Sequence, residues 1–177
     1  MSIETIGVFN SGESVVLPAP PSYTARIGLS DSSEIGLHFS HMTSLGADFK
    51  WNPIKGEVFD LALDPGGNVG FIASSAGSAF LYYAQLPVLL DFNFSESVTM
   101  VLSPGMGIYG ATGGTNADFA YSDTAPLFRG GVGFDFRTSK KFAVHPEVSI
   151  LIPFKEGYGT IFLGGIGFNF GTLPDFG

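Results

Sequence analysis

Histidines and carboxylates are the side chains of this chain that could carry acid–base chemistry. His145 and Glu147 stand two residues apart, and His41 lies next to an expected turn. A histidine beside a carboxylate can act as a general acid or base, but nucleophilic catalysis also needs an activated nucleophile such as serine. No G-x-S-x-G motif is present to supply that serine. We therefore expect a non-enzymatic protein whose histidines serve as hydrogen-bonding groups.

The composition excludes several other classes of function. The chain has 177 residues, with 8 Lys plus Arg against 16 Asp plus Glu, and a net charge of −8. Nucleic-acid binding needs clustered Lys and Arg, which an acidic chain with a pI near 4.6 does not offer. The absence of Cys excludes a disulfide scaffold, a Cys-ligated zinc site and thiol catalysis. We expect neither a cofactor nor a metal nor a nucleic-acid partner.

The chain also has too little polar surface for an ordinary soluble domain. Charged residues make up 14% of it and hydrophobic residues 45%, and the mean hydropathy is +0.30. Soluble domains carry about 25% charged residues, so something other than water should face part of this chain. A transmembrane helix needs about 20 consecutive apolar residues, and the longest apolar runs, such as residues 86–90, are much shorter.

The polar residues recur at every second position, opposite apolar residues. Between residues 85 and 94, Leu86 and Val88 share one parity, and Asp91 and Asn93 share the other. A period of two with one apolar parity is typical of a β-strand. An Arg or Lys facing lipid near the bilayer midplane would cost roughly 2–4 kcal/mol, so the charged parity should face a lumen. The predicted lumen residues are Arg26, His38, Asp48, Lys50, Asp60, Asp64, Asp91, Arg129, Asp135, Arg137, His145 and Glu147.

Turn-forming clusters divide the chain into ten expected strands in a single domain, residues 1–177. The expected strands are 3–10, 22–30, 34–41, 45–53, 58–74, 79–94, 98–110, 125–137, 141–154 and 158–172. Longer connectors are expected at 11–21 and 111–124, both at the end of the molecule opposite the tight turns. An even strand count and this asymmetry of connections favour an up-and-down antiparallel barrel. The first strand is the weakest, and losing it with one neighbour would leave eight strands.

Two segments resemble those of a known class of proteins. Residues 25–31 followed by 34–37 look like a turn-and-strand sequence that is common in the small outer-membrane β-barrel proteins of Gram-negative bacteria. Residues 165–170 resemble the C-terminal aromatic strand signal of the same proteins. The resemblance is to the OmpA- and OmpW-like class and identifies no specific family. It implies a closed all-β transmembrane barrel, integral to the outer membrane, in contact with its lipid and inserted by the barrel-assembly machinery. The class usually ends at the last aromatic residue, so 171–177 would be a short periplasmic tail.

The lumen could be open or filled. With Glu4, which shares the inward parity, seven acidic residues face four Arg and Lys, which favours a narrow cation-preferring channel. Alternatively, these residues form ion pairs that plug the interior, because a barrel near eight strands is just wide enough for side chains to fill it. A plugged barrel would be structural or would bind a partner. An envelope protein or a phage could bind the small polar connector at 111–124, since exposed loops often carry recognition.

Prolines inside the expected strands leave a second alternative, a lipid-handling barrel. Pro65, Pro87, Pro104 and Pro146 each lie several residues from the nearest expected turn. Proline cannot donate to the hydrogen-bond ladder and is found at edges or bulges. These prolines could therefore only bend their strands, or they could together create a lateral opening to the bilayer for a lateral-diffusion transporter. A lipid-modifying enzyme of the outer membrane is a further alternative in this group.

The N-terminus bears no secretory signal. The first residues lack a basic segment and an apolar segment, so the chain would be either cytoplasmic or a mature form with an added Met. The strand periodicity favours the mature form.

Overall fold

The computed structural model describes residues 2–10, 13–40, 44–74, 77–114 and 120–170. These residues form twelve β-strands. The strands are β1 (Ser2–Asn10), β2 (Glu13–Ser30), β3 (Ser33–Ser40), β4 (Ser44–Ile54), β5 (Phe59–Leu63), β6 (Gly66–Ser74), β7 (Gly77–Ser95), β8 (Val98–Leu102), β9 (Gly105–Gly114), β10 (Ala120–Ser139), β11 (Phe142–Pro153) and β12 (Thr160–Phe170). Among the described residues, no helix is long and apolar enough to cross a membrane.

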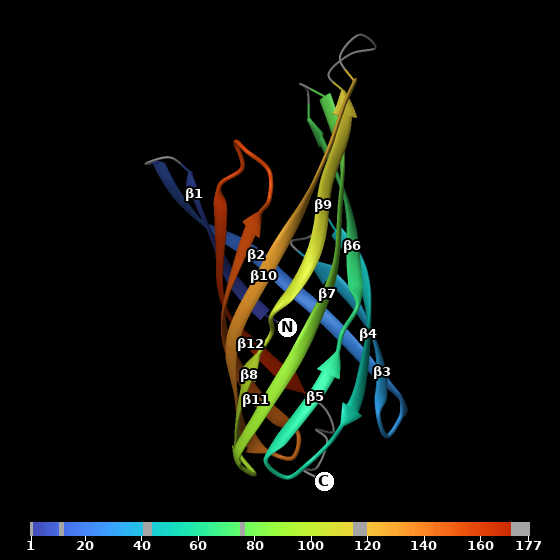
Figure 1. Ribbon diagram of the computed structural model, residues 1–177, viewed down its shortest axis with the longest axis vertical. Helices are drawn as coiled ribbons and strands as arrows, with labels where there is room; N and C mark the ends of the chain where they lie inside the picture. The colour runs from blue at the N-terminus through green and yellow to red at the C-terminus, as the bar shows by residue number, and fades with distance from the viewer. Residues whose placement is uncertain (1, 11–12, 41–43, 75–76, 115–119, 171–177) are drawn as a thin grey trace.

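The strands form one antiparallel sheet that closes on itself (Figure 1). Strands that follow one another in the chain pair, except β5 with β6 and β8 with β9, and the pairing of β12 with β1 closes the sheet. The short strands β5 and β6 share one position between β4 and β7, and β8 and β9 share one position between β7 and β10. The twelve described strands therefore occupy ten positions in the wall. The prediction of an up-and-down barrel of about ten strands is confirmed.

Tight serine turns join the strands at one end of the barrel. The backbone N–H of Ser32 donates to Ser30 Oγ at 3.3 Å, and that of Ser97 donates to Ser95 Oγ at 3.3 Å. The N–H of Lys141 makes the same contact with Ser139 Oγ at 3.2 Å. A serine hydroxyl that accepts from the amide two residues on stabilises a turn locally. These contacts explain why the short polar clusters read from the sequence become turns, and we call this end of the molecule the short-turn end.

Proline divides two of the expected strands. The expected strand 58–74 is interrupted at Asp64 and Pro65, and the expected strand 98–110 at Ser103 and Pro104. Both breaks lie beside Pro87 of β7. Backbone bonds still connect the strands there: the N–H of Asp64 donates to Pro87 O at 3.1 Å, that of Val88 to Pro104 O at 2.8 Å, and that of Ser103 to Gly131 O at 2.9 Å.

The expected connector at 11–21 is wrong, because the second strand begins at Glu13. Residues 13–19 pair with β1, and the register shifts between Ser2 and Glu4 on β1. Pro20 and Pro21 lie in that irregularity, where proline is tolerated because no ladder bond is required of it. Strand pairing with β1 therefore extends through a segment whose prolines suggest a loop.

The expected connector at 111–124 is also wrong at both ends. Residues 111–114 pair with β7 and β10, and residues 120–124 pair with β9. The central residues 115–119 lie outside the described part of the chain. Figure 1 shows β6, β7, β9 and β10 extending together at the end opposite the short turns. The extra pairing along these strands converts most of the predicted loop into sheet.

The interior is polar and the outer face is apolar, as the parity predicts. Large apolar side chains such as Ile27, Leu37, Leu45, Phe71 and Leu86 are exposed on the outside. The buried hydrophobic residues of the described chain are only Ala62, Ala125, Leu127 and Ala143. An apolar exterior around so small an apolar core is the arrangement expected of a protein whose outer solvent is lipid.

Candidate functional site

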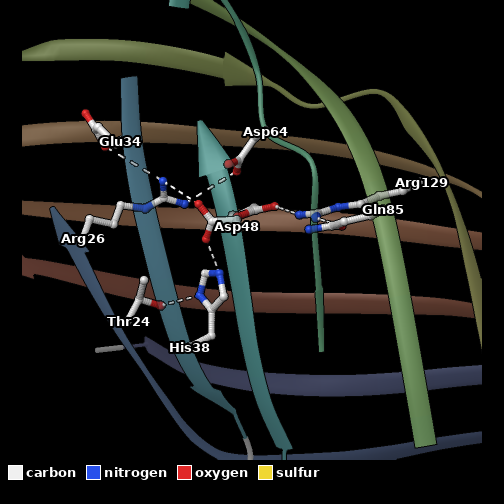
Figure 2. Close-up of polar contacts among 9 residues, drawn as sticks. Thr24, Arg26, Glu34, His38, Asp48, Asp64, Gln85 and Arg129 are labelled. Atoms are coloured by element: carbon white, nitrogen blue, oxygen red, sulfur yellow. Dashed lines mark hydrogen bonds and ion pairs between the residues drawn. The ribbon is translucent and has the colours of Figure 1, made fainter. Parts of the chain in front are cut away.

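One group of polar side chains lies on β2, β3 and β4 and at the break after β5. Arg26 is its centre: Nη1 lies 2.9 Å from Asp48 Oδ1 and 3.9 Å from Glu34 Oε2, and Nη2 lies 3.5 Å from Asp64 Oδ2. His38 Nε2 contacts the other Asp48 oxygen, and Thr24 Oγ1 lies 3.1 Å from His38 Nδ1. Figure 2 shows these side chains converging on Asp48. We call Thr24, Arg26, Glu34, His38, Asp48 and Asp64 the Arg26 network.

Two glycines make room for Asp48, whose side chain is only 2% exposed. Gly36 on β3 and Gly66 on β6 are its cross-strand neighbours. A Cβ at Gly66 would come within 2.8 Å of Asp48 Cβ, and one at Gly36 would overlap the carboxylate. A charged group this deeply buried needs ionic and hydrogen-bonding partners. The glycines allow Asp48 to lie against the wall, where Arg26 and His38 supply those partners.

A second group lies on β7, β10 and β11. Arg129 contacts Gln85 Oε1, and its Nη2 lies 3.2 Å from Glu147 Oε1. Tyr83 donates to Gln85 Oε1 at 2.8 Å, and Ser149 donates to Glu147 Oε1 at 2.6 Å. His145 lies between two carboxylates, with Nδ1 2.9 Å from Asp135 Oδ1 and Nε2 3.5 Å from Glu147 Oε2. The Arg129 network comprises Tyr83, Gln85, Arg129, Asp135, His145, Glu147 and Ser149.

Neither His38 nor His145, the two histidines in the described part of the chain, has the surroundings of a general base for a serine, and His41 lies outside the described residues. Both ring nitrogens of His145 contact carboxylates, and the Ser149 hydroxyl donates to Glu147. His38 does stand between the Thr24 hydroxyl and Asp48, but Asp48 is shared with the Arg26 guanidinium. These contacts form chains of hydrogen bonds and ion pairs that connect neighbouring strands, although Asp64 Oδ1 and Arg129 Nε are buried without a hydrogen-bond partner.

Both networks line one cavity of about 760 Å³. Nine of the twelve predicted lumen residues reach it: Arg26, His38, Lys50, Asp64, Asp91, Arg129, Asp135, His145 and Glu147. Asp48 lies behind Arg26 and His38. Asp60 accepts from the Gly56 amide at 2.7 Å and from Asn93 Nδ2 at 3.2 Å. Arg137 is not among the residues that line the cavity. The structure therefore gathers most of the predicted set, with Asp48 and Asp60 acting as supports.

Several polar lining residues are missing from the predicted set. Thr24, Glu34 and Gln85 line the cavity, and Ser103 and Asn169 also reach it. Each has the parity of its charged neighbours, such as Glu34 with Gly36 and His38. Parity could therefore have found them. The predicted set keeps only charged residues and histidines, so it omits the serine, the threonine and the amides, and it also omits Glu34 although that residue is charged. Within the described residues, no group of three or more His, Asp or Glu side chains is arranged to hold a metal ion.

An apolar layer lies beyond the Arg129 network, on the side away from the short turns. Leu127 precedes Arg129 by two residues on β10 and is only 1% exposed. A Cβ at Gly107 would lie 3.4 Å from Leu127 Cδ1 and 3.5 Å from Tyr83 Cε2, so both side chains pack over this glycine. Ala125, the next residue of the same parity, is also buried. Neither Leu127 nor Ala125 is among the residues that line the cavity.

Solved structures share this fold at low sequence identity. Ail, the attachment invasion locus protein of Yersinia pestis, is 14% identical, with a TM-score of 0.54, and the alignment covers 96% of each chain. Neisserial surface protein A is 9% identical, with a TM-score of 0.52, over 96% of this chain and 92% of that chain. No protein-family model and no curated protein sequence matches the chain. The likeness shows the fold, which is that of small outer-membrane β-barrels.

Proposed function

We propose that this protein is an integral outer-membrane barrel with a blocked lumen, and that it works as a structural or partner-binding barrel. It is neither a passive channel nor an enzyme. The apolar outer face and the likeness in fold to Ail and Neisserial surface protein A support the membrane location. The crystal structure of Ail with the heparin analogue sucrose octasulfate, a TM-score of 0.51 at 13% identity over 96% of both chains, is an example of a barrel of this fold with a ligand.

The observation that carries the proposal is the layer formed by Tyr83, Ala125 and Leu127. A water-filled pore needs polar side chains and open space along its whole length. In this protein Leu127 is buried against its neighbours and is not among the residues that line the cavity. An ion that entered from the short-turn end would meet the buried Leu127 directly beyond Arg129, on the wall formed by β7, β9 and β10.

The ion pairs further reduce the number of charges that could attract a permeating ion. Arg26 neutralises part of the acidic group on β2–β5, and Arg129 does the same for Glu147. In a barrel of about this width, side chains are long enough to meet across much of the interior. The ion pairs therefore offset part of the acidic charge of the lumen, although Glu34, Asp48 and Asp64 share the single guanidinium of Arg26.

Planar-bilayer conductance of the full chain tests the blocked lumen. We expect no discrete conductance from the unaltered protein and discrete channel openings from the Leu127→Gly, Arg129→Ala double variant, which removes the apolar layer and the adjoining ion pair. The matched control is Leu37→Gly, the same side-chain loss on the lipid-facing side, and it should stay silent. Discrete openings of the unaltered protein would contradict the proposal, whether or not the variants insert.

A further inference from the structure

The β10–β11 turn differs in charge from the other turns at the short-turn end. The two residues between β10 and β11, Lys140 and Lys141, are both cationic. The matching two-residue turn between β2 and β3 carries Asp31, and the one between β7 and β8 carries Glu96. The connection between β4 and β5 carries one residue of each sign. In a chain with a net charge of −8, the β10–β11 turn is therefore a local patch of positive charge.

The side chains of both lysines extend from a turn whose backbone is held in place. The N–H of Lys141 donates to Ser139 Oγ at 3.2 Å, and Thr138 Oγ1 donates to Phe142 O at 3.4 Å. Lys140 and Lys141 are exposed. Within the described part of the chain, neither ammonium group has an ion pair or a hydrogen bond. Both charges are therefore available to a group outside the barrel.

Phenylalanine rings cover the outer wall directly beside this turn. Phe142 follows Lys141 and pairs with Phe170 of β12, and the two ring centroids lie 5.1 Å apart. Phe142 has the parity opposite to the buried Ala143, so it faces outward. Phe136 of β10 and Phe170 are exposed on the same outer face. Phe has no polar group of the kind that places Tyr and Trp at the membrane–water interface. Hydrocarbon should therefore reach this row of rings.

The rings fix the depth at which the lysines lie in a membrane. A strand rises about 3.3 Å per residue, so the backbone of the turn is within about 7 Å of the backbone of Phe142. Lipid headgroups lie immediately outside the hydrocarbon core. Lysine stems can lie along an apolar surface while the ammonium group remains among the headgroups. Lys140 and Lys141 should therefore meet the phosphate groups of the adjacent lipid.

We propose that the β10–β11 turn binds the headgroup of an anionic phospholipid in the leaflet at the short-turn end, with the acyl chains against Phe142 and Phe170. The proposal rests on the membrane location in the proposed function and goes beyond it by naming a lipid class and its contact site. The two ammonium groups donate to the phosphate diester, whose negative charge attracts nearby lysines. A zwitterionic lipid gains less, because its own ammonium group offsets the phosphate.

Local fluorescence quenching tests the proposal, because the chain contains a single Trp that can be moved. Trp51→Phe with Phe142→Trp places the Trp beside Lys141. Trp51→Phe with Phe94→Trp is the matched control, since Phe94 is exposed on the outer face beside the acidic Glu96 turn. The full chain is reconstituted in phosphatidylcholine vesicles that contain a minor fraction of brominated phosphatidylglycerol or brominated phosphatidylcholine. Bromine quenches only a nearby Trp, so the ratio of the two signals measures local enrichment of the anionic lipid.

We expect about fivefold enrichment of phosphatidylglycerol at the Phe142→Trp reporter at low salt, and no enrichment at the Phe94→Trp reporter. Adding Lys140→Gln and Lys141→Gln should abolish the enrichment at the Phe142→Trp reporter. High salt should weaken the enrichment, because it screens exposed charges. Equal enrichment at the two reporters, or enrichment that survives the lysine substitutions, would overturn the proposal.

Two further measurements separate the remaining explanations. Residues 171–177 follow Phe170 and contain Asp175. Enrichment that appears only after these residues are deleted would overturn the proposal, because the chain's own carboxylate would then occupy the lysines. The native Trp51 is exposed on the outer face, so its quenching by brominated phosphatidylcholine reports insertion of the unaltered protein. Without that quenching the membrane location itself fails, whereas quenching without enrichment at the Phe142→Trp reporter removes only the lipid site.

Discussion

The Arg26 and Arg129 networks face the same cavity, but they stand in walls of different completeness. Among the described residues, residues 23–30 of β2, which include Arg26, pair with β3 alone. The strands that carry the Arg129 network, β7, β10 and β11, have neighbours on both sides at those residues. The burial also differs: the Asp48 side chain is 2% exposed, whereas that of Glu147 is 33% exposed.

This difference separates the two roles that ion pairs have in a barrel. Where the backbone ladder is incomplete, the side chains of the Arg26 network bind β2 to β3, β4 and the break after β5. Where the ladder is complete, the Arg129 network adds less to the strength of the wall and instead fills the lumen below Leu127. The two networks should therefore respond differently to loss of their arginine.

The largest expected effect is that of Arg26→Met, which leaves the buried Asp48 without its guanidinium partner. Breaking a buried ion pair costs about 3–5 kcal/mol, and we expect a loss of roughly 3 kcal/mol in the free energy of unfolding. Arg129→Met should cost about 1 kcal/mol, because its partner Glu147 is partly exposed. Urea unfolding of both variants in lipid vesicles measures the difference.

A double variant sharpens the same comparison. Arg26→Met with Asp48→Leu removes both charges, and it should recover part of the lost stability because the most deeply buried carboxylate is gone, although Asp64 still lacks its guanidinium partner. Equal losses in the free energy of unfolding for Arg26→Met and Arg129→Met would contradict the view that the Arg26 network stabilises the barrel more than the Arg129 network does.

An intermediate effect is expected for Gly36→Ala, which tests the space beside Asp48. The added methyl group would overlap the Asp48 carboxylate, and overpacking of this kind costs about 1–3 kcal/mol. Gly28→Ala is the matched control, since a Cβ at Gly28 of β2 would meet nothing within 4 Å. Comparable unfolding midpoints for the two alanine variants would show that Asp48 moves aside freely.

The smallest effect is expected at the proline breaks beside the Arg129 network. Backbone bonds at Pro87 and Pro104 keep that wall connected, so these breaks should not admit lipid. Pro87→Ala and Pro104→Val should therefore leave lipid uptake by the reconstituted protein unchanged, as measured with a fluorescent phospholipid. A clear loss of lipid uptake in either variant would contradict this prediction and would support a lateral opening at these prolines, with a lipid-handling role.

Local patterns in the sequence determined the strands, their two faces and the turns at one end. The alternation of polar and apolar residues along a strand repeats every two residues. The turns at Ser30, Ser95 and Ser139 depend on hydrogen bonds between residues two apart in the chain. Nine of the twelve predicted lumen residues accordingly line the cavity. Short-range physics of this kind acts on the chain before any distant strand is paired.

Only the tertiary structure decided which inward residues meet and where the wall ends. Asp48 reaches Arg26 and His38 because the registers of β2, β3 and β4 bring them level, and no spacing within one strand encodes that alignment. The extension of β2 back to Glu13 and the burial of Leu127 likewise depend on partners far away in the chain. The parity of a residue within its strand determines whether it faces the lumen or the lipid. Pairing between distant segments sets the register and the strand lengths, and these determine which residues become neighbours.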